Sequence, residues 1–182
     1  MHKKGVLIDT SFLIRLLATD DALYKNANEY FKYCLNQKIT MWISTIAIAE
    51  FTVKGNVDDL PIINFKVLPF NYQEAKRAGE LARIIFDKRK NNEIELKDRA
   101  IIPNDVKLFA QADVSKNIEY YLSSDEESFK IYNISKDETD INFHFISLKT
   151  PIIESILLEE STENHTLASK GIFKLNNKNR YC

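Results

Sequence analysis

Four carboxylates stand at element boundaries or on an apolar face, where a folded chain could use them for chemistry: Asp9, Glu50, Asp105 and Asp125. Asp9 ends the short apolar run Val6–Ile8, and Asp125 follows a second such run. Glu50 falls on the apolar stripe of a helical segment, where a carboxylate must be paired or bind a cation. A simpler interpretation stays open for Asp9, because it or Ser11 could merely cap the helix that follows.

Together, the four acids point to a divalent cation. Two like unit charges about 4 Å apart repel by roughly 4 kcal/mol at an effective dielectric constant near 20, so the cluster needs a counter-charge or raised pKa values. A set of oxygen ligands favours Mg²⁺ or Mn²⁺ over Zn²⁺. Spacing alone does not establish the cluster, because the 26 acidic residues of the chain offer many other quartets.

The elements that must position these acids alternate between strand and helix patterns. Five short apolar segments are predicted to be strands: Val6–Ile8, Met41–Ile43, Phe65–Pro69, Glu119–Leu122 and Phe143–Ile146. Helical spacing lies between these strands. It is clearest over Tyr72–Phe86, where one face is formed by Tyr72, Ala75, Ala78, Ala82, Ile85 and Phe86. Asn104 and Asp105 open a further helical segment, and Ser44 is the expected N-cap of a helix over Thr45–Lys54, although Ile46–Ala49 also suits a strand. This alternation predicts an α/β/α sandwich with a central, mainly parallel sheet of about five strands. The first and fourth strands of such a sheet end at the same edge, which brings Asp9 and Asp125 together.

The composition predicts a cytoplasmic protein with one main domain. The 182 residues are 45% hydrophobic, which is enough for a core. The net charge is −1, so nucleic-acid binding would need a local basic patch or metal ions. The two cysteines lie far apart and form neither a disulfide framework nor a zinc pattern, which favours a reducing compartment. No apolar run has the length of a signal peptide core or a membrane span, so no membrane association is expected.

Four segments hold the acids and their neighbours in order: Leu7–Ser11, Ile43–Phe51, Ile101–Ala112 and Leu122–Asp125. By this order and spacing the chain resembles the PIN-domain family of metal-dependent ribonucleases over roughly residues 5–147. The family includes the VapC-like toxins of bacterial toxin–antitoxin pairs. The resemblance implies that Asp9, Glu50, Asp105 and Asp125 are catalytic and bind Mg²⁺ or Mn²⁺, with Ser11 and Ser124 in support. It also implies RNA as the substrate, an antitoxin protein as a partner, and a homodimer.

One departure from the family pattern concerns Asp125. The approach from this acid to Phe129 is one residue longer than usual, so that Glu126 or Glu127 could take its place. This departure supports an alternative function, a PIN-like module that binds RNA or protein without nuclease activity.

The resemblance also sets the domain prediction, which is a nuclease domain over residues 1–149 and a C-terminal part over 150–182 of unknown role. Within that part, Ile152–Glu160 has the pattern of an amphipathic helix. The segment Thr166–Cys182 carries four basic residues and no acids. It is either a solvated tail or an arm that contacts nucleic acid or a partner.

Overall fold

The computed structural model describes residues 5–91 and 101–153, and among these the side chains of 101–103 are not described. The chain divides into two compact units, Met1–Lys149 and Thr150–Cys182. Of the second unit only residues 150–153 are described, and 152 and 153 are helical. The rest of the helix predicted over 152–160, and the basic segment 166–182, lie outside the described residues.

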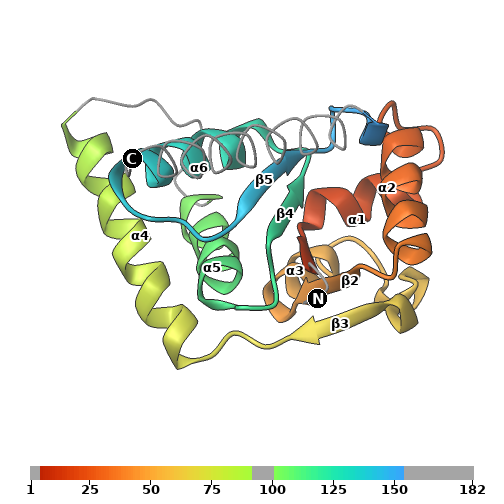
Figure 1. Cartoon of the computed structure of the whole chain (residues 1–182), viewed down its shortest axis with the longest axis horizontal. Helices are drawn as coiled ribbons and strands as arrows, with labels where there is room; N and C mark the ends of the chain where they lie inside the picture. Colours follow the sequence, from red (N-terminus) through yellow and green to blue (C-terminus); the bar gives the residue numbers. More distant parts are fainter. Residues whose placement is uncertain (1–4, 92–100, 154–182) are drawn as a thin grey trace, which may run out of the picture. The chain divides into compact units, whose positions relative to one another are not determined.

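Five parallel strands of the first unit form one sheet in the order β3-β2-β1-β4-β5 (Figure 1). The strands are β1 Gly5–Ile8, β2 Thr40–Ser44, β3 Phe65–Leu68, β4 Tyr120–Ser123 and β5 His144–Ser147. The central strand β1 is buried at every residue, and its Leu7 lies opposite Trp42 of β2 and Tyr121 of β4. Gly5 begins this strand because an added Cβ would overlap the carbonyl oxygen of Asn117. The predicted sheet is confirmed.

Helices cover both sides of this sheet. They are α1 Thr10–Leu17, α2 Tyr24–Asn36, α3 Thr45–Phe51, α4 Tyr72–Lys90, α5 Ile101–Val114 and α6 Glu126–Glu138. α1 contacts α2 and α3, whereas α4, α5 and α6 contact one another, and Figure 1 shows α1 and α2 on the opposite side of the sheet from α4, α5 and α6. The chain runs from β1 through β2 to the edge strand β3, and then crosses back over β1 to β4 and β5. Because the direction across the sheet reverses, right-handed connections put the two groups of helices on opposite faces. The predicted α/β/α sandwich is confirmed. No helix in the described part is both long and apolar enough to cross a membrane.

Two helices differ from the sequence-based expectation. The helix that carries Asp105 begins at Ile101 rather than at Asn104, so Asp105 lies in its second turn. Pro103 is tolerated there because the first turn of a helix leaves backbone N–H groups unbonded anyway. In α4 the predicted face is buried only in part: Ala78 and Ile85 are buried, whereas Tyr72 is 77% exposed. Leu81, which was not assigned to that face, is also buried. Only the middle of α4 is covered, because its neighbours are α5 and α6 and not the sheet itself.

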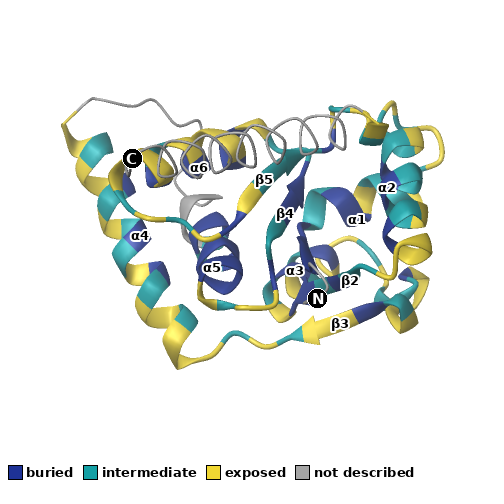
Figure 2. Ribbon diagram, in the orientation of Figure 1, coloured by how far each residue is buried: buried dark blue, intermediate teal, exposed yellow. Residues whose placement is uncertain are grey.

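The core is centred on β1, β4 and α5, which Figure 2 shows mostly in the colour of buried residues. Aromatic rings join these elements. The Phe109 ring of α5 meets the Tyr121 ring of β4 edge to face, with centroids 5.0 Å apart, and lies 5.5 Å from Phe143. Such pairs add to the free energy already gained by burial. This packing fixes α5, and therefore Asp105, against the carboxyl end of the sheet.

At pH 8, Cys34 of the folded protein is expected to resist alkylation. This α2 residue is 5% exposed, and burial raises the pKa of its thiol to about 12. Only the thiolate attacks an alkylating reagent, so labelling should require unfolding. Peptide mapping after iodoacetamide treatment, with and without urea, measures this. Full labelling of Cys34 without urea would contradict its buried position.

Candidate functional site

Asp9 and Asp125 follow two neighbouring strands at the point where the strand order reverses. The chain leaves β1 toward β2 on one side and returns to β4 on the other, which is where open α/β sheets bind ligands. The backbone N–H of Asp9 donates to the carbonyl oxygen of Leu122 at 3.1 Å, so the two strand ends stay paired up to the acids. The side chain of Asp9 is close to fully buried, at 6% exposed.

Two serine hydroxyls hold the carboxylate of Asp9. Its Oδ2 accepts from Ser11 Oγ at 2.6 Å and from Ser123 Oγ at 2.7 Å. It also accepts from the backbone N–H of Ser11 at 3.4 Å and so caps α1. The capping interpretation of Asp9 is therefore correct, and it does not exclude a second role for the same carboxylate.

Asp125 is held by the start of α6. Its Oδ1 accepts from the backbone N–H groups of Glu127 at 2.8 Å and Ser128 at 3.4 Å. The buried hydroxyl of Ser123 accepts from the backbone N–H of Asp125 at 3.0 Å while it donates to Asp9. A single serine thus connects the acids that follow β1 and β4.

Glu50 reaches the same region from α3, where it is partly buried. Its Oε2 accepts from the Thr10 hydroxyl at 2.6 Å, and its Oε1 accepts from the Asn104 amide at 2.6 Å. These donors come from α1 and α5, so the Glu50 side chain bridges the two helices. The predicted N-cap of its own helix is confirmed, because the Ser44 hydroxyl accepts from the backbone N–H of Ile46 at 3.0 Å.

Asp105 has a carboxylate oxygen that lacks a hydrogen bond among the described residues. This oxygen, Oδ2, is buried, and the residue is 6% exposed. The pKa of this carboxyl is raised to about 8, and burial is the largest cause. The negative charges of Asp9 and Asp125 raise it further, and the charge of Glu50 contributes least. The nearby Ser128 hydroxyl lowers this pKa as a hydrogen-bond donor would, although its placement falls short of hydrogen-bond geometry. All four predicted acids therefore lie within electrostatic reach of one another.

The arrangement fits a divalent cation in chemistry. All four side chains offer oxygen, as Mg²⁺ and Mn²⁺ prefer, and the unpartnered Oδ2 of Asp105 is an acceptor that needs a positive charge or a proton. The carboxylates are nevertheless turned toward their protein donors. Among residues 5–91 and 101–153, no three acidic, histidine or cysteine side chains lie close enough together to hold a metal ion as they stand. Metal ligation by these four acids stays a prediction.

The two acids that follow Asp125 have other partners. Glu127 is 8% exposed and pairs with Lys130 at 2.7 Å, and Glu126 pairs with Lys149. Both line a pocket of about 310 Å³ together with Asp125 and Arg15. Asp125 is among the charges that raise the pKa of Asp105. The electrostatic coupling thus favours Asp125 as the fourth acid.

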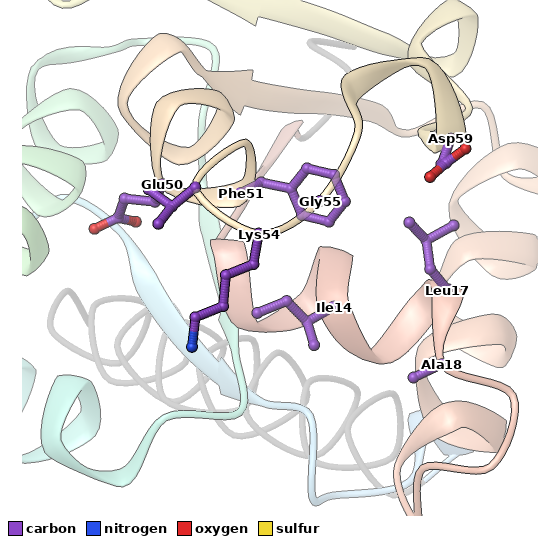
Figure 3. A pocket seen from close by; sticks show the side chains of 9 residues that line it. Ile14, Leu17, Ala18, Glu50, Phe51, Lys54, Gly55 and Asp59 are labelled. Carbon is purple, nitrogen blue, oxygen red and sulfur yellow. The ribbon is translucent and has the colours of Figure 1, made fainter.

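A second and larger pocket, of about 580 Å³, begins at Glu50 (Figure 3). Its walls are largely apolar and come from the end of α1 and from the segment after α3. Figure 3 shows the Glu50 carboxylate at one end of this pocket and Asp59 at the other, with Ile14 and Leu17 between them. The acid site is therefore continuous with an apolar groove.

Sequence reasoning missed three residues that hold the acids, namely Thr10, Asn104 and Ser123. It named Ser124 as support, but in the structure the Ser124 backbone N–H donates to Ser11 at 3.0 Å, and the Ser124 hydroxyl has no described partner. The signal for Thr10 and Asn104 was present, since each adjoins a predicted acid. Nothing in the sequence showed that both reach Glu50.

Comparison with known proteins finds relatives only by structure. No protein-family model matches the chain, and no curated protein matches its sequence. The chain is similar to a chain of VapBC2 from Rickettsia felis bound to a promoter DNA fragment, with a TM-score of 0.53 and 14% identity over 78% of this chain and 97% of that chain.

Two further solved structures resemble the chain less closely in TM-score. One is DNA-bound VapBC from Salmonella typhimurium, with a TM-score of 0.48 and 15% identity over 80% of this chain and 98% of that chain. The other is VapC20 of Mycobacterium tuberculosis, a toxin that cleaves the Sarcin-Ricin loop. Its TM-score is 0.47, and it is 18% identical over 69% of this chain and 94% of that chain. The likeness to VapBC2, together with the parallel five-stranded sheet between two helical layers, shows that this protein has the PIN-like α/β fold predicted from its sequence.

Proposed function

We propose that the protein is a metal-dependent endoribonuclease that hydrolyses RNA phosphodiester bonds, and that it acts as the toxin of a toxin–antitoxin pair. The observation that carries the nuclease proposal is the buried, unpartnered Oδ2 of Asp105 among three further carboxylates at the carboxyl edge of β1 and β4. Four coupled carboxylates do not all stay ionised at one place without a compensating charge, and without one Asp105 holds a proton. A bound cation is the simplest such charge for an oxygen-only set.

In this proposal Asp9, Asp105 and Asp125 hold Mg²⁺ or Mn²⁺ together with Glu50. The cation would supply Lewis-acid activation of the attacking water and neutralise charge on the leaving oxygen. The serine hydroxyls fix Asp9 in one orientation, since Ser11 and Ser123 donate to the same oxygen. The backbone N–H groups of α6 do the same for Asp125. Asp105 is left with an oxygen that no described protein donor satisfies, which makes it the acid most in need of the cation.

Basic side chains around the acids support RNA binding by a protein whose net charge is −1. Arg15 lines the pocket beside Asp125, and Lys54 lines the groove beside Glu50. Lys107 of α5 lies next to Asn104, with its Nζ 3.3 Å from the amide oxygen. Arg15 also pairs with Asp21 at 3.4 Å. These cations would meet the phosphates of an RNA strand that crosses the site.

Replacing Asp9 by asparagine tests the nuclease proposal. Purified protein is incubated with single-stranded RNA and Mn²⁺, beside the Asp9→Asn variant and Asp137→Asn, an exposed acid of α6, as the matched control. We expect cleavage by the wild type and the control, and a loss of roughly 100-fold or more in Asp9→Asn, because metal ligation contributes several kcal/mol and each 1.4 kcal/mol is a factor of ten. Equal cleavage by all three proteins, or by none, would contradict the proposal.

A binding module without nuclease activity is the second candidate. It is favoured by the hydrogen bonds that already occupy Asp9, Glu50 and Asp125, and by the lack of a closed ligand set among the described residues. The two functions differ in one measurement. A binding module would retain RNA in a gel-shift assay with Mn²⁺ without shortening it, and Asp9→Asn would bind RNA as well as the wild type.

The proposed toxin role, the antitoxin partner and the homodimer rest on the family resemblance and on the fold. A toxin of this kind should have a small antitoxin encoded beside it. Expression of the wild type alone should arrest growth, and co-expression of the neighbouring reading frame should restore it. Normal growth of cells that express active wild-type nuclease would contradict the toxin role while leaving the nuclease proposal intact.

A further inference from the structure

Both carboxylate oxygens of Glu50 are held by donors from other helices. Thr10 of α1 donates to Oε2 and Asn104 of α5 donates to Oε1, both at 2.6 Å. Glu50 itself sits near the end of the seven-residue helix α3. A long side chain on a short helix has many rotamers available, and two short bonds from opposite sides select one of them. The direction in which Glu50 presents its carboxylate is therefore set by its partners.

Lys107 fixes the orientation of the Asn104 amide. Its Nζ donates to Asn104 Oδ1 at 3.3 Å, and the two residues are three apart on α5 and so lie on one face. An ammonium can only donate and a carboxylate can only accept. The Asn104 amide can satisfy both neighbours in one orientation only, with its oxygen toward Lys107 and its nitrogen toward Glu50. Both bonds involve a charged group, which strengthens them.

We infer that Asn104, oriented by Lys107, is a positioning residue that sets the affinity of the acid site for its divalent cation through Glu50. This inference rests on the proposed function, since it concerns the same site. A carboxylate offers about four lone-pair positions, so Glu50 can keep the bonds from Thr10 and Asn104 and still present an oxygen to a cation. Partners that orient a ligand in this way typically change metal affinity by about 10-fold to 100-fold when removed.

The arrangement also predicts how the three residues depend on one another. Lys107 reaches Glu50 only through the Asn104 amide in the described contacts. Once Asn104 is replaced by alanine, the hydrogen-bonded link from Lys107 to Glu50 is lost, and only the through-space effect of the Lys107 charge remains. The effects of the two substitutions on cation affinity should therefore not add, whereas independent sites would give additive effects.

The experiment measures Mn²⁺ binding to the full chain by electron paramagnetic resonance of free Mn²⁺, without RNA. The variants are Asn104→Ala, Lys107→Gln and the double variant, with Asn133→Ala, an exposed asparagine of α6, as the matched control. Urea unfolding of each variant shows that the fold is intact. We expect affinity to fall about 10-fold to 100-fold in Asn104→Ala, to fall less in Lys107→Gln, and to stay unchanged in the control. The double variant should bind Mn²⁺ no more weakly than Asn104→Ala, because the remaining effect of removing the Lys107 charge is a loss of repulsion between that charge and the cation.

Three outcomes would overturn the inference. Wild-type affinity in Asn104→Ala would show that the amide does not position Glu50, and the proposed nuclease would still stand if the wild type binds Mn²⁺ and cleaves RNA. Additive losses in the double variant would show that Lys107 acts by another route. A wild type that binds no Mn²⁺ at millimolar concentration would remove both the inference and the metal-dependent function. If Asn104→Ala does not fold, the Lys107→Gln variant alone decides, because an unchanged affinity there contradicts the orienting role of Lys107.

Discussion

The Asp105→Asn variant is expected to be more stable than the wild type without metal ions, although it should no longer cleave RNA. Burial and the nearby carboxylates raise the pKa of Asp105 to about 8, so the folded state holds a proton that the unfolded chain releases above pH 4. An asparagine carries no charge in either state and removes this penalty. Each pKa unit corresponds to about 1.4 kcal/mol, and the buried amide offsets part of the gain, so we expect about 1–3 kcal/mol at pH 7.

The pH dependence of unfolding makes this prediction specific. A carboxyl group whose pKa is higher in the folded state stabilises the fold below the unfolded pKa, and that contribution is lost as pH rises toward the folded pKa. In EDTA, the wild type should therefore lose stability between about pH 4 and pH 8 relative to Asp105→Asn. Urea unfolding at pH 4, 6 and 8 measures this difference. Asp137→Asn, at an exposed position, should stay within about 0.5 kcal/mol of the wild type.

Metal ions should reverse the order of the two proteins. A ligand that binds only the folded state stabilises it, so Mn²⁺ should raise the unfolding midpoint of the wild type and leave that of Asp105→Asn nearly unchanged. RNA cleavage by the variant should fall roughly 100-fold or more. A variant that is less stable than the wild type in EDTA at pH 8 would show that the Asp105 carboxylate is satisfied in solution by a partner the structure does not place there.

The strands and the acids behind them could be predicted because their signals are local. Val6–Ile8 is apolar at each position because β1 lies in the middle of a parallel sheet and is buried on both faces. Ser44 was predictable as a cap because a capping hydroxyl needs only the backbone two residues ahead. The family resemblance then selected these four acids from the 26 acidic residues of the chain, which periodicity alone could not do.

The residues that hold those acids could not be predicted, because their hydrogen bonds join distant parts of the chain. The bonds of Glu50 reach 40 residues back to Thr10 and 54 residues forward to Asn104, and Ser123 reaches across 114 residues to Asp9. Helical or strand periodicity carries no information over such separations. The burial of Leu81 and the exposure of Tyr72 in α4 were missed for a related reason, because both residues are apolar and only the position of the neighbouring helices decides which one is covered.

Replacing Phe109 by alanine should give a large loss of stability, about 3–5 kcal/mol. The Phe109 side chain is fully buried on α5, and its ring contacts the rings of Tyr121, Tyr132 and Phe143 at centroid distances of 5.0–6.3 Å. Three aromatic neighbours cannot close around a methyl group, so the substitution leaves a cavity as well as losing buried area. Urea unfolding at pH 7 measures the loss. Phe86→Ala is the matched control, because that ring of α4 is 45% exposed and should cost about 1 kcal/mol or less.

The same substitution should also weaken cation binding, and this links the core to the site. Phe109 lies four residues after Asp105 on α5, so both side chains lie on one face of the helix. The ring that seats α5 against β4 therefore also sets the distance from Asp105 to the acids that follow β1 and β4. A Phe109→Ala protein kept folded at low temperature should bind Mn²⁺ more weakly than Phe86→Ala does. Equal Mn²⁺ affinity in the two variants, despite the expected difference in unfolding free energy, would show that the acid site keeps its geometry independently of the aromatic core.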